Sequence, residues 1–295
     1  ITTLLDQNYN ESLKQEKIYN TKNYKGAKTL LFGLKDLSTY ENEISLEELN
    51  KYKDKEIYLA LDKNMFNEDL PKLEESLKEI DKLNIKGVLF YDLAVLHISK
   101  RLNLKTPLIW NQNFLVTNYK TCNFYEKQNI KGAVISGEIT IEEIEQLAKN
   151  TKIDLYINAF GYQLMAISKR KLITNYFNHT KEKNQEKAHK MIEKENSYPI
   201  IENKTCTKIY TKEVLNAVKY LNRLKQAGIK YIILNDILLD EEKFNKVAKI
   251  YEEALNKNET DQELLEREKQ IKNIINNTST LFLDKKTIYK VKRKW

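Results

Sequence analysis

Short apolar runs alternate with amphipathic segments along this chain, and that alternation constrains its fold most. The runs cover residues 1–5, 29–32, 57–61, 87–91, 107–110, 132–135, 153–157 and 231–234. Between them, apolar residues recur every three or four positions, as in Leu73, Leu77 and Ile80, which predicts helices. Strands that are apolar throughout are typical of a parallel sheet covered on both faces. The alternation therefore predicts an α/β fold, a TIM-barrel-like (β/α)8 barrel.

The predicted organisation is a single barrel domain over residues 1–258 with a long insertion, residues 159–210, after the seventh strand. A helix is expected from about residue 211, because Val214, Val218 and Leu221 have helical spacing and Gly228 suits its end. Residues 259–295 are expected to form a C-terminal helix and a basic tail packed on the barrel.

Charge and cysteine content limit the classes of site. The net charge is +8, which fits either a solvated basic surface or a surface that attracts nucleic-acid phosphates. Two cysteines, Cys122 and Cys206, exclude a four-cysteine zinc or iron–sulfur site within this chain. No stretch of eighteen apolar residues occurs and the first residues lack a basic leader, so we expect a cytoplasmic protein without membrane spans.

Polar residues at the ends of the predicted strands are candidates for chemistry, because barrel active sites lie at the carboxyl ends of strands. The alternative for each of them is that it caps the following helix. These residues are Asp62, Asp92, Asn111, Glu138, Asn158, Asn235 and Asp236.

The insertion carries a different combination of residues. Lys169 and Arg170 lie in a run of three cations, and Asn175 and Tyr176 follow within seven residues. Cations that meet phosphates and aromatic rings that stack on bases are typical of nucleic-acid binding. The chain shows no nucleophile elbow, zinc-protease helix motif or Ser/His/Asp signature, so no protease motif competes with this interpretation.

Four segments, in order, resemble the collagenase-like peptidase family, number thirty-two among the unassigned (U) peptidases. Residues 168–177, SKRKLITNYF, resemble a family segment with Ser, a basic pair, Leu and a final Asn-Tyr-Phe. The other three are Trp110-Asn111 with residues 117–125 (TNYKTCNFY), residues 136–139 (SGEI), and residues 198–202 (YPIIE) with 207–210 (TKIY). The likeness is strongest to the short bacterial branch of the family.

The resemblance implies a (β/α)8 barrel and a role in RNA chemistry. Several family members take part in RNA hydroxylation, notably the formation of 5-hydroxyuridine at the wobble position of tRNA. A short and a long paralogue occur together in that branch, and prephenate serves as the metabolite related to oxygen transfer. Other members act in ubiquinone hydroxylation. tRNA, a longer cysteine-bearing paralogue and a prephenate-like metabolite are therefore the implied partners and ligand.

This chain departs from the family at several positions. The family's histidine and cysteine after strand seven are replaced within residues 159–164, AFGYQL, and its Arg-Glu pair is Gly137-Glu138. The four cysteines that hold an iron–sulfur cluster are absent, and Cys206 stands where the family has glycine. The departures imply a chain with no cofactor of its own and no metal ligands, acting as a non-cluster partner of the longer paralogue.

The implied site residues fall into two sets. Glu138 and Asn111 are the catalytic candidates, orienting a ligand from strand ends. The substrate-binding candidates are Lys169, Arg170, Asn175, Tyr176, Asn158 and Asp92. Arginine forks suit both phosphate and carboxylate groups, so Lys169 and Arg170 are expected to bind RNA phosphate or the carboxylated metabolite. Whether the chain is an enzyme stays open, with a genuine peptidase and a catalytically inactive binding or assembly subunit as alternatives.

Overall fold

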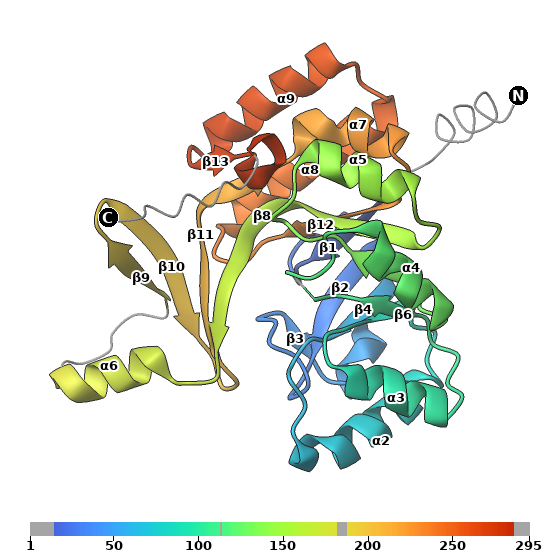
Figure 1. Ribbon diagram of the computed structural model, residues 1–295. Coiled ribbons are helices and arrows are strands. Elements are labelled where there is room, and N and C mark those ends of the chain that lie inside the picture. Colours follow the sequence, from blue (N-terminus) through green and yellow to red (C-terminus); the bar gives the residue numbers. More distant parts are fainter. Residues whose placement is uncertain (1–14, 113, 182–187, 286–295) are drawn as a thin grey trace, which may run out of the picture.

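A closed parallel barrel forms the body of the molecule (Figure 1). The computed structural model describes residues 15–112, 114–181 and 188–285. Within them, eight parallel strands follow one another around the barrel, and β12 closes the circle by pairing with both β1 and β8. The predicted (β/α)8 fold is therefore confirmed. The barrel strands are β1 Glu16–Asn20, β2 Thr29–Leu34, β4 Glu56–Leu61, β5 Gly87–Phe90, β6 Leu108–Trp110, β7 Gly132–Val134, β8 Asp154–Ser168 and β12 Tyr231–Asn235.

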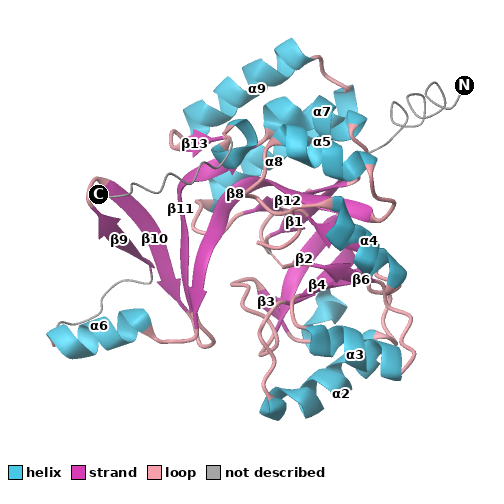
Figure 2. Cartoon of the chain, viewed as in Figure 1, coloured by secondary structure: helices cyan, strands magenta, loops and turns pink. Residues whose placement is uncertain are grey.

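Helices cover the outside of the barrel (Figure 2). They are α2 Leu70–Ile80, α3 Leu93–Arg101, α4 Tyr119–Lys127, α5 Ile141–Lys149, α7 Leu221–Gln226, α8 Glu241–Lys257 and α9 Asp261–Ile274. Helix α5 begins with a capping box: Thr140 Oγ1 accepts from the Glu143 amide at 3.3 Å, and the Glu143 carboxylate accepts from the Thr140 amide at 2.9 Å. Such capping satisfies amides that would otherwise lack partners.

Alternate residues of each strand enter two separate cores. One core contains strand residues and Tyr40 without any helix residue, so it fills the barrel interior, where Tyr156 and Tyr231 stack with ring centroids 4.2 Å apart. The other combines strand residues such as Leu59 with helix residues such as Leu73, and it lies between barrel and helices. This two-faced burial is the physical reason that the strands are apolar throughout.

The insertion continues the barrel sheet outward. Strand β8 leaves the barrel and pairs antiparallel with β11 Thr207–Asn216, and β10 Asn196–Glu202 and β9 Ala188–Glu193 follow in sheet order. Helix α6 Leu172–Thr180 lies beside this ribbon. We call residues 162–181 and 188–211 the arm. Figure 1 shows the arm projecting from the barrel.

One predicted element lies outside the described residues, and another differs in the structure. The first is the strand predicted over residues 1–5; among the described residues, β1 is the strand that pairs with β12 and β2. The helix predicted from residue 211 is wrong at its start, because residues up to Asn216 belong to β11 and pair with β8. Pairing with an existing strand overrides the helical spacing of Val214 and Val218. Helical structure begins only at the 3₁₀ turn Val218–Tyr220, followed by α7.

The C-terminal region packs on the barrel's helical layer. Leu264 and Ile271 of α9 are buried in the outer core, and β13 Thr278–Ser279 pairs with β11. Residues 286–295, which include the basic tail, lie outside the described part. Smaller elements are β3 Glu43–Ile44 and the 3₁₀ turns Glu47–Tyr52, Asn67–Asp69 and Leu281–Asp284. None of the helices in the described ranges is long and apolar enough to cross a membrane.

Candidate functional site

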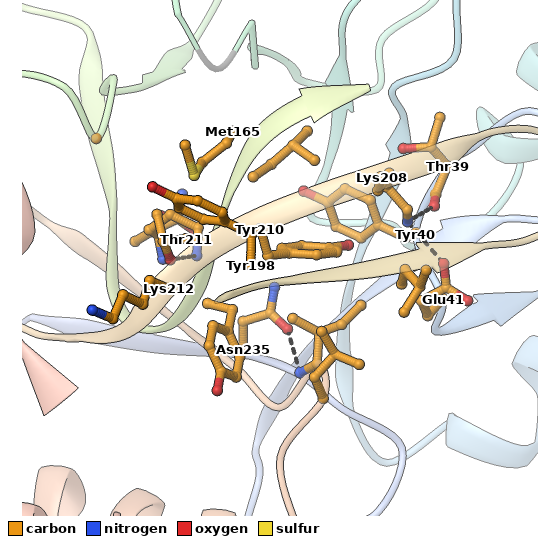
Figure 3. Close-up of a pocket in the computed structure, with 18 of the residues that line it drawn as sticks. Thr39, Tyr40, Glu41, Met165, Tyr198, Lys208, Tyr210, Thr211, Lys212 and Asn235 are labelled. Atoms are coloured by element: carbon orange, nitrogen blue, oxygen red, sulfur yellow. Dashed lines mark hydrogen bonds and ion pairs between the residues drawn. The ribbon is translucent and has the colours of Figure 1, made fainter. Parts of the chain in front are cut away.

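A cavity of about 990 Å³ lies at the carboxyl end of the barrel, between the strand ends and the arm. Figure 3 shows that its wall is shared: Tyr40, Glu41 and Asn235 come from the barrel side, while Tyr198, Lys208 and Tyr210 come from the arm. Cavities of this size and position hold ligands in many barrels. Other lining residues are Asn20, Asn42, Asp62, Glu138, Asn158, Gln163, Met165, Thr211, Lys212, Glu213 and Asp236.

The strand-end rule locates much of the barrel side correctly. Asp62, Glu138, Asn158, Asn235 and Asp236 all line the cavity. Asn158 lies within β8, close to the last residue of that strand that pairs with β12, and the other four end or follow a barrel strand. Within the described chain, neither the Glu138 carboxylate nor the Asn158 carboxamide has a hydrogen-bond partner. Polar groups without protein partners at a cavity wall are available to a ligand.

Other carboxylates of the cavity are already engaged. Asp62 accepts from Ser38 Oγ at 2.5 Å, from the Thr39 amide at 2.8 Å and from Thr39 Oγ1 at 2.5 Å. Asp236 accepts from Asn42 Nδ2 at 3.1 Å, and burial raises the pKa of the Asp236 carboxyl above its ordinary value. These two carboxylates hold the loops of the barrel mouth in place.

On the arm side the cavity has a buried cation. Lys208 is 3% exposed, donates to the Thr39 carbonyl and pairs with Glu41 Oε1 at 2.9 Å. Burial alone would lower the pKa of Lys208, but Tyr210 and Glu41 raise it above its ordinary value. Burial also raises the pKa of Tyr210, to about 12, so its hydroxyl stays protonated at neutral pH.

Asn111 and Asp92 do not line the cavity. Asn111 is buried behind it and donates from Nδ2 to Tyr40 Oη at 3.4 Å, so it contacts a residue that does line the cavity. Asp92 caps α3 by accepting from the Ala94 amide at 2.8 Å, and it also accepts from the Met65 amide at 2.9 Å. Asp92 thus has the capping contacts that the alternative interpretation anticipated.

The four predicted residues of the insertion lie on the arm outside the cavity lining. Lys169 Nζ sits 3.1 Å from the centroid of the Phe66 ring on the barrel rim. Tyr176 is 57% exposed on α6, and Asn175 is exposed beside it. In the described part of the chain, the Arg170 guanidinium has no ion-pair partner. The structure therefore separates the predicted residues into a cavity set and an arm set.

Among the cavity residues that sequence reasoning missed, three form contacts that shape the site. Tyr40 comes from the loop between β2 and β3, and Lys208 and Tyr210 come from a strand outside the barrel. None of them follows an apolar strand run, so the strand-end rule could not find them. The available signal was the motif at residues 207–210, which the family resemblance had already marked.

The cysteines do not fit an iron–sulfur cluster. Four thiolates normally hold one, and this chain has two cysteines, both free and buried. Burial raises the pKa of the Cys122 thiol to about 12, which disfavours the thiolate that binds metal. Among residues 15–112, 114–181 and 188–285, no group of three or more His, Cys, Asp or Glu side chains is arranged to hold a metal ion.

Comparison with known proteins places the chain in one family. The profile of peptidase family U32 matches residues 17–292. A protein named tRNA hydroxylation protein P2, from Bacillus subtilis, is 27% identical over 249 residues, covering 79% of this chain and 81% of that protein. tRNA hydroxylation protein P1 of the same organism is 25% identical over 124 residues, 41% of this chain and 28% of that protein.

Two further relatives carry peptidase names. A protein named as an uncharacterized protease, from Methanocaldococcus jannaschii, is 30% identical over 164 residues, covering 51% of this chain and 40% of that protein. A solved structure of a U32 peptidase has a TM-score of 0.48 at 10% identity, covering 76% of this chain and 93% of that one. The family profile spans nearly the whole chain. This protein is a member of peptidase family U32.

Proposed function

We propose that this chain takes part in the hydroxylation of tRNA at the wobble uridine, in the cytoplasm, as a partner of a longer, cysteine-bearing paralogue. The observation that carries the proposal is the cavity between barrel and arm, in a chain that aligns with tRNA hydroxylation protein P2 over most of both lengths. Its volume of about 990 Å³ can admit a single nucleoside extruded from a loop.

In this proposal the residues of this chain bind the RNA and orient the target base. Glu138 and Asn158 offer a free acceptor and a free amide on the barrel side of the cavity, and Asn111 donates to the hydroxyl of Tyr40, which lines the same cavity. Such preorganised groups position a base without having to move when it arrives. Lys169, Arg170, Asn175 and Tyr176 contact the phosphates and neighbouring bases of the RNA outside the cavity.

A prephenate-like carboxylate is the second ligand of the proposal. Of the two lysines that line the cavity, Lys208 is paired with Glu41, while Lys212 donates only to Asn196 Oδ1 at 3.3 Å within the described chain. Lys212 is therefore the cation that a carboxylate would meet. Oxidation of the base requires redox chemistry that these residues do not supply, which is why the proposal includes the longer paralogue.

The test is mass spectrometry of tRNA nucleosides from cells that lack this gene, complemented with wild type or single variants. Loss of the gene should abolish 5-hydroxyuridine, and the wild-type gene should restore it. Glu138→Gln, which keeps the side chain's shape and removes its charge, should restore at most about a tenth of the wild-type level.

Glu142→Gln is the matched control, because Glu142 is an exposed glutamate nearby in sequence, on α5 and paired with Arg223. It should complement fully. Unchanged 5-hydroxyuridine in the deletion strain would remove the tRNA proposal. Purified chain should then be assayed for peptide hydrolysis, the activity that the family name suggests, before a purely structural role is assigned.

A further inference from the structure

The arm joins the barrel through a narrow root. Beyond Phe160, β8 no longer pairs with β12, so β11 is its continuing neighbour. Both strands are irregular at this level. Gly161 has a φ of 116°, and a Cβ there would lie 2.5 Å from the Asn235 carbonyl oxygen, so other residues are excluded.

The ladder between β8 and β11 also breaks at the root. Tyr162 pairs with Val214 and Leu164 with Tyr210, so three residues of β11 oppose a single residue of β8. Bulges bend a strand and interrupt its ladder, and hinges are built from a few such positions. The root therefore combines a glycine and a bulge where the arm leaves the barrel.

At its far end the arm is held by a second, polar attachment. The turn between β10 and β11 presents Asn203, whose Nδ2 donates to Glu41 Oε1 at 2.9 Å and to the Thr39 carbonyl at 3.3 Å. Lys208 contacts the same two rim residues. We call these four residues, Thr39, Glu41, Asn203 and Lys208, the clasp.

The turn is shaped to present its amide to the rim. Asn203 Oδ1 accepts from the amides of Thr205 at 2.9 Å and Cys206 at 3.0 Å, which leaves Nδ2 pointing outward. Glu41 is the side-chain acceptor common to both arm donors, which also share the Thr39 carbonyl, and the Glu41 side chain is 36% exposed. One carboxylate therefore contacts both arm donors, and the cavity lies between the clasp and the root.

We propose that the arm is a gate over the cavity, bending at Gly161 and the β11 bulge and held closed by the clasp. Closure brings Tyr198, Lys208 and Tyr210 against the barrel mouth and completes the cavity wall. Opening separates that wall from the strand ends and gives a macromolecular ligand a side entrance. Gating by a hinged element over a barrel mouth is a common way to admit a ligand and then exclude water.

The experiment measures the distance between arm and barrel in the full-length protein without any ligand. Spin labels replace Tyr176 on α6 and Leu93 on the barrel rim, both more than half exposed, while the native cysteines are buried and escape labelling. The α6 label reports the arm because Glu202 of β10 accepts from the Ile173 amide at 2.9 Å.

Double electron–electron resonance on the wild type should give one dominant distance. Glu41→Ala removes the shared acceptor, and Asn203→Asp keeps the turn but places a carboxylate against Glu41. Each variant should raise the population at a longer distance about tenfold. Asp36→Asn is the control, since Asp36 lies on the same rim and pairs with the exposed Lys72. Asparagine tolerates the left-handed backbone of this position, whose φ is 66°, so the variant should leave the distribution unchanged.

Wild-type distance distributions in both Glu41→Ala and Asn203→Asp would overturn the gate, because the arm would then be rigid without its clasp. A longer distance that also appeared in Asp36→Asn would overturn the role of the clasp. The measurement needs no RNA, so its failure leaves the tRNA proposal untouched, and loss of the tRNA proposal leaves the gate standing.

Discussion

The surfaces of the barrel and the arm differ in the ion pairing of their cations and in their exposed apolar side chains. On the barrel, many exposed cations are paired with carboxylates, as in Arg101 with Glu74 and Arg223 with Glu145. On the described part of the arm, Lys208 forms an ion pair whose partner, Glu41, belongs to the barrel, and the Arg170 guanidinium has no ion-pair partner there. The arm also exposes large apolar side chains, namely Met165, Ile167, Leu172, Tyr176, Met191 and Ile192.

The difference indicates which region carries stability and which is available for contact. In the barrel, surface ion pairs and buried apolar cores give many charged and apolar side chains partners within the barrel itself. Unpaired cations and exposed apolar or aromatic side chains leave the arm's surface ready for a partner. Each of the following predictions tests that division, from the largest expected effect to the smallest.

The largest expected effect is on the free energy of unfolding, when a buried barrel residue and an exposed arm residue are each replaced by alanine. Leu59 of β4 is fully buried, so Leu59→Ala should lower the free energy of unfolding by about 2–5 kcal/mol. Ile192 of β9 is 75% exposed, so Ile192→Ala should change it by less than about 0.5 kcal/mol. Urea denaturation measures both. Comparable losses in the two variants would mean that the arm belongs to the same stabilising core.

The boundary between the two regions is tested at Tyr251 of α8. Its buried hydroxyl lies 2.9 Å from the Ala159 carbonyl and 3.0 Å from Asn216 Oδ1, and it accepts from the Ala217 amide at 3.1 Å. Tyr251→Phe should cost about 1–3 kcal/mol, because buried polar groups lose a partner. Unfolding should stay a single transition. A separate arm transition in this variant would mean that barrel and arm unfold independently once this hydroxyl is lost.

The free cations of the arm are tested by RNA affinity, which depends on the proposed function. Arg170→Ala should raise the Kd for a tRNA anticodon stem-loop by about three- to tenfold and flatten its salt dependence. Arg101→Ala is the barrel control, since Arg101 is already paired with Glu74. Fluorescence anisotropy at two salt concentrations measures both. Equal changes in Kd for the two variants would mean that paired barrel cations and unpaired arm cations contribute alike to RNA binding.

The smallest effect is expected at Asp236 on the barrel mouth. Burial raises its pKa above the ordinary 3.8, so the folded state binds this proton more tightly than the unfolded state does. Stability from this group is therefore gained as pH falls through the folded pKa and is absent at neutral pH. Asp236→Asn should raise the urea midpoint at pH 7, and the gain should shrink toward pH 4.

The control for that prediction is Asp54→Asn, at a carboxylate whose side chain is 73% exposed. Its urea midpoint should follow the wild type at both pH values. A gain for Asp236→Asn that stayed constant with pH would assign the effect to packing rather than to the buried charge.

Most of the barrel could be predicted from the sequence, because burial on two faces leaves apolar runs that are visible without a structure. Strand β1 was not predicted, because Glu16–Asn20 has only two apolar residues in five, Ile18 and Tyr19. They follow two charged residues at the more exposed start of the strand. The start of the 211–224 segment was misread because its apolar spacing suits a helix, whereas its real partner is β8, distant in sequence.

The candidate site could be predicted only in part. Glu138 and Asn158 follow from the rule for strand ends, since the barrel itself brings those positions together. Lys208 and Tyr40 meet only because the arm bends back over the mouth, and no local pattern encodes that approach. Contacts between segments that are distant in sequence, such as the arm and the barrel mouth, produce no periodic pattern of residues in either segment.

Strand β8 belongs to the barrel and the arm at once, without a linker between them. Growth or loss of the arm during evolution thus amounts to lengthening or trimming an existing strand, rather than inserting a separate module. Trimming near the root would remove the arm's share of the cavity wall while all eight barrel positions stayed filled. Descendants of one ancestral barrel could in this way acquire different ligands by remodelling a single extension.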